Sequence, residues 1–322
     1  MVKNSSKGAA RYAQVVVQLL RLVGRRRPDA YLVTFRGYEI LPIVLLLAGR
    51  RPVYYDEFIN PVEWFVEEHR KFAAGSFAAR LLRGAFRFLM KRTAGILTDT
   101  ESHADHSAEL MGIARERFTS VPVGGDEERF TPRARIPHEG LRVLYYGSML
   151  PLHGLPTVLE AAVEAGEGNE IELVLVGGDD ATRSLIEEAS SRGARVDYRT
   201  WVDYELLPEL ISHCDLMLGG PFGDTVQARY VITGKTYQFL ASSVATVVGE
   251  NLESGVFTDK LDALVVPQGN ASALAACFRW ALEHRSELEE IGAAGHALYE
   301  KEFSAAVIAR RLALAFRPEH SP

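Results

Sequence analysis

The sequence predicts an α/β protein made of two doubly wound domains that face each other across a cleft. Its 322 residues are enough for two domains that each bury a core. Short β-branched runs alternate with helical segments along most of the chain, and this alternation indicates parallel sheets covered by helices. A charged segment with a proline, residues 133–140, lies between the two series. We therefore expect domains at 1–135 and 136–302, and a C-terminal helix at 303–322 that could cross back to the first domain.

The second half of the chain shows the clearer alternation. Its expected strands are 141–147, 171–177, 195–198, 215–219, 244–249 and 263–266. Its expected helices are 155–166, 182–192, 205–213, 235–241 and 271–284. In a doubly wound, Rossmann-like domain the ligand lies beyond the carboxyl ends of the strands, so the loops after these strands are the first candidates for a site.

The first half repeats the pattern less regularly. Its expected helices are 12–26, 40–48, 62–92 with an interruption near Gly75, and 102–111. Its expected strands are 31–35, 53–56, 96–99 and 118–121.

Composition excludes several classes of protein. With 47% hydrophobic and 24% charged residues the chain is neither disordered nor fibrous. The longest apolar stretch, residues 40–48, contains Pro42 and is about half a membrane span. We find no signal-peptide pattern, and the two cysteines form no disulfide framework or metal motif, so we expect a cytoplasmic protein.

Charge is distributed unevenly along the chain. Residues 1–135 hold 22 Lys and Arg against 15 Asp and Glu, whereas residues 136–322 hold 14 against 27. The acidic second half disfavours nucleic acid as a partner. The basic first half fits an anionic membrane surface, an anionic substrate or simply solvated helix faces. In residues 81–92 basic side chains alternate with Leu, Phe and Met, so this helix either lies on a membrane or packs against its own domain.

The loop Gly147-Ser148-Met-Leu-Pro-Leu-His153-Gly154 comes between an expected strand and an expected helix. Gly147 allows the turn, and Gly154 opens a helix whose first N–H groups can face an anion. His153 adds to that field. The simpler interpretation is an ordinary turn.

Three further loops follow strands of the second half. Gly177-Gly178-Asp179-Asp180 is either a binding turn or a simple connection. Trp201-Val202-Asp203 could read a nucleobase, although packing of Trp201 is the simpler interpretation. The long loop 219–234 leads to Lys235 near a helix start, where a cation opposes the helix dipole unless an anion is bound between them.

These four segments, in this order, resemble the family-four glycosyltransferases, which are retaining enzymes of the two-domain GT-B fold. The likeness covers about residues 27–303. Residues 146–154 are similar to the phosphate loop of one branch, and residues 218–241 to its "LGxFGxT…NKVYEALA" segment. Residues 120–132 resemble "PNGVD…FxP", and Asp99-Thr100 with His103 resembles "DTxxH".

The resemblance implies a function for each half of the chain. The second domain would bind a nucleoside-diphosphate sugar, and the first would present a glycan or lipid-linked acceptor, peripherally at the inner face of a membrane. Lys235 and His153 would act on the diphosphate, and Asp99 and His103 would lie on the acceptor side. The other nucleotide-sugar residues would be Gly147, Ser148, Gly154, Gly177, Trp201, Val202, Phe222, Gly223, Thr225 and Gln238. Transfer with retention at the front face would need no protein nucleophile, no metal and no cofactor.

The sequence also departs from the family. Gln238 and Tyr230 stand at the two positions of its Glu-x7-Glu motif, and the first βα unit is missing or divergent. A neutral amide makes weaker bonds to ribose hydroxyls than a carboxylate does. The alternative is therefore a non-catalytic GT-B protein that binds a partner enzyme or a nucleotide without turnover.

Two acidic or histidine-rich segments have competing interpretations. His103 and His106, with Asp99 and Asp105, could hold zinc, but no third strong ligand has suitable spacing, and a helix cap accounts for the pattern. Glu63, Glu67 and Glu68 are most simply a solvated helix face.

Overall fold

The computed structural model describes residues 8, 10–25, 28–35, 37–166 and 170–316. By its internal contacts the chain divides into two compact units, Met1–Val121 with Arg310–Pro322, and Pro122–Ala309. The segment 133–140, which we expected to link the domains, lies inside the second unit. Residue 26 and residues 317–322, which we expected to be helical, lie outside the described residues.

The second unit contains a parallel sheet of six strands in the order β10-β9-β8-β5-β6-β7. The strands are β5 (Leu141–Tyr146), β6 (Ile171–Val176), β7 (Val196–Arg199), β8 (Leu216–Leu218), β9 (Thr246–Glu250) and β10 (Leu264–Pro267). Side chains alternate between the two faces: Val143 and Tyr145 of β5 join the core on one face, and Leu144 and Tyr146 the core on the other.

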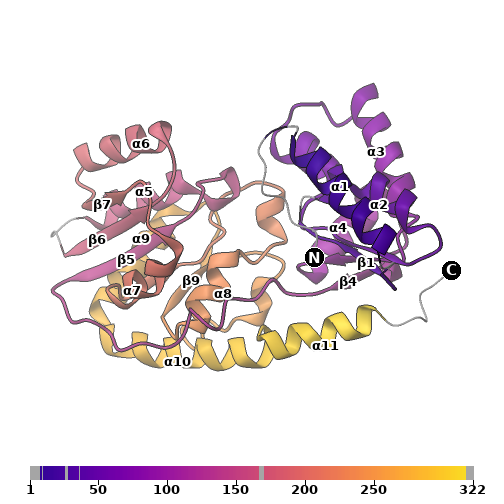
Figure 1. Ribbon diagram of the computed structural model, residues 1–322. Coiled ribbons are helices and arrows are strands. Elements are labelled where there is room, and N and C mark those ends of the chain that lie inside the picture. The colour runs from indigo at the N-terminus through magenta and orange to yellow at the C-terminus, as the bar shows by residue number, and fades with distance from the viewer. Residues whose placement is uncertain (1–7, 9, 26–27, 36, 167–169, 317–322) are drawn as a thin grey trace. The chain divides into compact units, whose positions relative to one another are not determined.

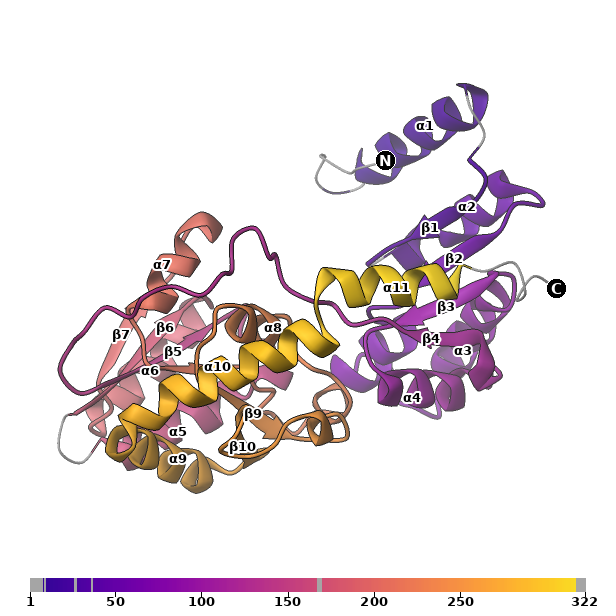
Figure 2. The same ribbon diagram turned by 90° about the horizontal axis from the view of Figure 1, so that it is seen from below.

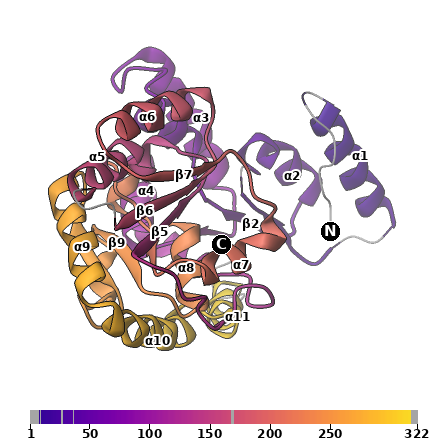
Figure 3. The ribbon, with the colours of Figure 1, turned by 90° about the vertical axis from the view of Figure 1, so that its left-hand side faces the viewer.

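Helices cover both faces of this sheet (Figures 1 and 3). One face packs against α5 (Leu155–Ala165), α6 (Asp180–Ser191) and α9 (Ala271–Glu283). The other packs against α7 (Leu207–Ser212), α8 (Gly234–Ala241) and α10 (Arg285–Glu302). The order of the strands reverses between β5 and β8, and in such sheets the crevice at the carboxyl ends of the two diverging strands is the usual ligand site.

The first unit contains a parallel sheet in the order β1-β2-β3-β4, with strands Tyr31–Val33, Val53–Asp56, Gly95–Thr98 and Phe118–Ser120 (Figure 2). Because the strands follow one another across the sheet, right-handed crossovers place the connecting helices on one face. These are α2 (Leu41–Ala48), α3 (Phe77–Met90) and α4 (Glu101–Met111), and α1 (Ala10–Arg25) joins the same core. Tyr54 points to the opposite face, where its ring lies 4.6 Å from that of Phe316.

The expected strands are all present, with ends shifted by no more than two residues. The expected helical region 62–92 is interrupted near Gly75 as predicted: it consists of a π-helix, η2 (Glu63–Glu68), and α3, separated by a loop that contains Gly75. The sequence did not predict α10, and the last helix, α11 (Ala305–Ala315), begins two residues after the expected position. Among the described residues, no helix combines the length and hydropathy needed to cross a bilayer.

Candidate active site

The loop after β5 packs its backbone directly against the loop after β8. Gly154, with φ 69°, precedes α5, and a Cβ built there would lie 2.3 Å from the carbonyl carbon of Phe222 and 2.4 Å from the nitrogen of Gly223. Gly223 N–H donates to the Leu152 carbonyl at 3.0 Å. Only glycine fits at position 154, so these two loops form one rigid wall beside the point where the strand order reverses.

Gly147 and Gly177 bring the ends of β5 and β6 together in the same way. A Cβ on Gly177 would lie 2.1 Å from the Gly147 oxygen. Both residues have positive φ, 152° at Gly147 and 106° at Gly177. Neither residue places a side chain over the end of β5, and the N-terminus of α5 lies close by.

Lys235 lies in the first turn of α8 and is 7% exposed. Among the described residues its Nζ has no hydrogen-bond partner, and it sits 4.1 Å from the centre of the Tyr145 ring. Burial lowers the pKa of Lys235 from 10.5 to about 7, because the charged form loses its hydration. Burial without a carboxylate disfavours the ammonium form, which an anion bound beside Nζ would stabilise.

His153 faces the same point. A Cβ on Gly147 would lie 3.3 Å from His153 Cε1 and 4.0 Å from Lys235 Nζ. Burial, and then the charge of Lys235, lower the pKa of His153 to about 3, so the imidazole is neutral near pH 7. Its Nδ1 has no hydrogen-bond partner in the described part of the chain. The structure thus brings Gly147, Gly154, His153 and Lys235 together, and their binding of a diphosphate stays a prediction.

Gln238 lies one turn after Lys235 and is held between two tyrosines. Tyr146 Oη donates to Gln238 Oε1 at 2.5 Å, and Gln238 Nε2 donates to Tyr204 Oη at 3.4 Å. Because Tyr146 is the residue before Gly147, its hydrogen bond joins the Gln238 amide to the end of β5. Tyr204 follows the Trp201 loop, so its hydrogen bond with Gln238 joins that loop to α8.

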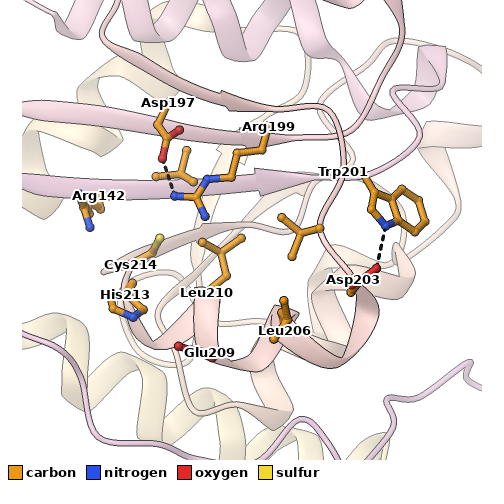
Figure 4. A pocket seen from close by; sticks show the side chains of 12 residues that line it. Arg142, Asp197, Arg199, Trp201, Asp203, Leu206, Glu209, Leu210, His213 and Cys214 are labelled. Atoms are coloured by element: carbon orange, nitrogen blue, oxygen red, sulfur yellow. Dashed lines mark hydrogen bonds and ion pairs between the residues drawn. The ribbon is translucent and has the colours of Figure 1, made fainter.

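Trp201 projects from the end of β7 and is 76% exposed, so the packing interpretation of this residue was wrong. Its Nε1 donates to Asp203 at 3.1 Å. Trp201 and Val202 border a pocket of about 530 Å³ between the sheet and α7 (Figure 4). Arg142, Arg199 and Cys214 also line this pocket. Arg199 is paired with Asp197 at 2.7 Å, and Arg142 with Glu172 at 2.8 Å.

Three expected binding residues have other surroundings. Ser148 is exposed next to Gly147. The Phe222 ring is 1% exposed and belongs to the core, so only its backbone reaches the wall with Gly154. Thr225 Oγ1 accepts from the Ala228 N–H at 3.3 Å, just before the short helix η6 (Gln227–Arg229).

In the first unit, Asp99 and His103 belong to a buried polar cluster. His103 is 0% exposed, with Nδ1 2.5 Å from Asp99 and Nε2 3.3 Å from both oxygens of Glu63. Burial lowers the pKa of His103, but the carboxylates of Glu63 and Asp99 outweigh burial and raise it well above its ordinary value. The ring is therefore enclosed by carboxylates and is not presented to solvent.

The same cluster corrects one sequence-based interpretation, and a second one, zinc held by His103 with His106, was already disfavoured by the sequence. Glu63 is 1% exposed and is not part of a solvated face. His106 bonds to Glu67 at 2.9 Å and Asp105 pairs with Arg115, so neither belongs to a zinc site with His103.

Several residues of these sites carried no sequence signal. Tyr145 and Tyr204 lie beside Lys235 and Gln238, and Glu57 and Asn60 complete the cluster around Glu63. The tyrosine pair at the end of β5 could have been found, because alternation along a strand places one of them on each face.

Comparison with curated proteins finds a partial likeness. D-inositol 3-phosphate glycosyltransferase of Acidothermus cellulolyticus is 31% identical over 106 residues, which are 29% of this chain and 24% of that protein. The match therefore spans about a quarter of the relative's length. No model of a known protein family matches the chain.

Solved structures resemble the chain over nearly its whole length. HepE of Anabaena in complex with UDP-glucose has a TM-score of 0.72 at 13% identity, over 96% of this chain and 83% of HepE. Sucrose-phosphate synthase of Thermosynechococcus elongatus has a TM-score of 0.73 at 15% identity, over 96% and 78%. A TarM variant of S. aureus has 0.70 at 12%, over 94% and 59%. The likeness confirms the predicted fold class, two parallel-sheet α/β domains of the GT-B fold.

Proposed function

We propose that the chain is a retaining glycosyltransferase that binds a nucleoside-diphosphate sugar in its second unit. The observation that carries the proposal is the buried Nζ of Lys235 beside Gly147 and His153, which has no hydrogen-bond partner among the described residues. A diphosphate at this point would supply the missing anion. The partial likeness to a curated glycosyltransferase, and the UDP-glucose bound by HepE, support this choice of ligand.

In this proposal the protein stabilises the leaving group. Lys235 and the N-terminus of α5 would oppose the negative charge that develops on the diphosphate, in a site that excludes water. The neutral His153 would donate a hydrogen bond from its ring. Among the described residues no carboxylate is paired with Lys235, and front-face transfer with retention requires none. The acceptor, a glycan or lipid-linked saccharide, would be bound and presented by the first unit.

Titration calorimetry of the full chain with UDP, GDP, ADP and their glucose conjugates, in excess EDTA, tests this function. We expect one of them to bind at a single site, and expect added Mg²⁺ to leave its affinity unchanged. Binding of none of them, or binding only with Mg²⁺ or Mn²⁺, would remove the proposal.

The second candidate function is nucleotide or partner binding without turnover. The observation that favours it is Gln238, whose Oε1 already accepts a hydrogen bond from Tyr146. Release of free nucleoside diphosphate together with a glycosylated product distinguishes the two candidates, since a non-catalytic protein would bind without releasing either.

Gln238→Glu should tighten nucleotide-sugar binding by about 1 kcal/mol, or roughly fivefold. One carboxylate oxygen can keep the bond from Tyr146, while the other replaces Nε2 and can accept a ribose hydroxyl through a charge-assisted bond. Matched titrations of wild type, Gln238→Glu and Gln238→Met check this, with melting curves to confirm folding. Equal or weaker binding by the Glu variant would show that Gln238 is not a weakened ribose ligand.

We also propose that α3 binds anionic membranes. Its inner face, with Ala79, Phe86 and Met90, packs in the core, but its outer face exposes Phe77, Leu81 and Phe88 at 75%, 63% and 56%. The helix contains no acidic residue, and exposed Arg80, Arg87, Lys91 and Arg92 accompany these apolar side chains. The inner face of α3 thus packs against its own domain, and the outer face is free to contact a membrane in our proposal.

The double variant Leu81→Ser/Phe88→Ser should bind anionic vesicles at least about tenfold more weakly than wild type, because each inserted apolar side chain contributes about 1–2 kcal/mol. Leu252→Ser, at a position of the second unit that is 72% exposed, is the control. Wild-type binding should fall steeply with salt, since exposed charges are screened within about 10 Å at 0.1 M. Failure of the wild type to sediment with vesicles at low salt would contradict the proposal.

A further inference from the structure

The buried polar cluster of the first unit joins three elements at the carboxyl edge of its sheet. Glu57 directly follows β2, Glu63 begins η2, and His103 lies in the first turn of α4 after β3. All three side chains are at most 1% exposed. One ligand atom from each lies within 4.8 Å of the other two.

One carboxylate oxygen of this cluster, Oε2 of Glu57, has no hydrogen-bond partner among the described residues. Glu57 Oε1 accepts from Asn60 Nδ2 at 2.8 Å and from Ser107 Oγ at 2.5 Å, but Oε2 is buried without a hydrogen-bond partner among the described residues. A buried carboxylate oxygen with no donor is unfavourable, and either a proton or a bound cation would stabilise it.

The contacts of His103 have the geometry of a metal ligand. Its Nδ1 is 2.5 Å from Asp99, which leaves Nε2 directed at Glu63. A carboxylate behind the imidazole is the usual support of a metal-bound histidine. The 3.3 Å between Nε2 and each Glu63 oxygen is long for a hydrogen bond. It equals the separation of about 3.3 Å between two ligand atoms of a tetrahedral ion with bonds of about 2.0–2.1 Å.

The charges around the cluster favour a cation. Glu57, Glu63 and Asp99 face a single imidazole, and Asp56, at the end of β2, adds a fourth carboxyl group. In the described part of the chain no lysine or arginine pairs with Glu57, Glu63 or Asp99. Low exposure strengthens the mutual repulsion of these carboxylates, which a divalent ion would relieve.

We propose that Glu57, Glu63 and His103 bind one divalent transition-metal ion, with zinc the best match to two carboxylates and an imidazole. His103 would bind through neutral Nε2, with its Nδ1–H donated to Asp99. The ion would connect β2, η2 and α4 and so fix the loops at the carboxyl edge of this sheet. It lies in the first unit and takes no part in the donor chemistry proposed for the second.

Metal content and melting temperature of the full chain test this site. After dialysis against a chelator, the wild type should take up about one zinc ion per chain, and its melting temperature should rise. Glu57→Gln, which keeps the shape of the side chain, should lower zinc affinity at least about a hundredfold, and Asp99→Asn about 10- to 100-fold. The control is Glu67→Gln, which changes a carboxylate of the same π-helix that bonds to His106, outside the cluster.

A measurement on the wild type alone guards against variants that do not fold. Co²⁺ should give the intense visible bands of a four-coordinate site without a thiolate charge-transfer band, which separates this site from the two cysteines. Chelation should leave nucleoside-diphosphate binding unchanged, so failure of the metal site and failure of the proposed function are distinguishable. A folded wild type that takes up no zinc, or a Glu57→Gln variant that binds it equally well, would overturn the proposal.

Discussion

Replacing Lys235 by methionine is expected to weaken nucleoside-diphosphate binding by about 1.5–3 kcal/mol, or roughly 10- to 150-fold. The variant loses the buried ammonium group beside Gly147 and His153 while keeping most of the apolar contacts of the side chain. Titration calorimetry of both proteins measures the effect. The same substitution at Lys301, which is exposed on α10, should leave the affinity unchanged.

Lys235→Met should also stabilise the protein when no ligand is bound. The pKa of Lys235 falls from 10.5 to about 7 in the folded state. Below pH 7 the folded chain must keep a charge buried that the unfolded chain keeps in water. The free energy of unfolding of the wild type should therefore rise between about pH 7 and 10.5, and Lys235→Met should remove this dependence and gain about 2–4 kcal/mol at pH 7. A lysine with a purely structural role would give the opposite result, a loss of stability.

Diphosphate binding should also depend on pH through this lysine. The bound anion raises the pKa of Lys235 above its value of about 7 in the free protein, so binding takes up a proton once the free lysine is neutral. Affinity should then fall as pH rises above 7, by up to about tenfold per pH unit. Calorimetry in two buffers of different ionisation enthalpy measures this proton uptake. A pH-independent affinity, or no difference between Lys235→Met and wild type, would remove Lys235 from the site.

The loops of the second unit could be predicted because their signals are local. Gly147, Gly154 and Gly177 each follow a strand or precede a helix, and the turn that they permit is written in a few neighbouring residues. The order of strands and helices then places these loops at the carboxyl edge of one sheet.

Contacts between distant parts of the chain could not be predicted in this way. His103 meets Glu63 across 40 residues, and Tyr146 meets Gln238 across 92. A carboxylate-rich segment normally indicates a solvated face, and the sequence contains nothing local to show that η2 buries Glu63.

The failure to predict helix α10 has a different physical cause. Gly292 and Gly295 lower its helix propensity and obscure its pattern. In the structure these glycines are required by close packing. A Cβ on Gly292 would lie 2.7 Å from the Ser243 oxygen, and one on Gly295 would lie 2.6 Å from the Asp262 oxygen. Tertiary packing therefore outweighs local propensity here.

Gly154→Ala should both destabilise the second unit and abolish nucleoside-diphosphate binding. At φ 69° any side chain adds about 1–2 kcal/mol of backbone strain, and a Cβ 2.3–2.4 Å from the Phe222 and Gly223 backbone adds about 1–3 kcal/mol more. The clash pushes the loop after β5 away from the loop after β8, which moves the N-terminus of α5 out of line with Lys235.

Gly269→Ala is the matched control, because Gly269 has φ 68° but a Cβ there would meet nothing within 4 Å. It should lose only the strain of about 1–2 kcal/mol and keep the wild-type affinity. Urea unfolding of both variants, with titrations at a temperature where both remain folded, separates strain from clash. Equal losses of stability, or a Gly154→Ala variant that binds as tightly as wild type, would mean that the two loops are not in contact at Gly154. The anion would then have to be held by other groups around Lys235.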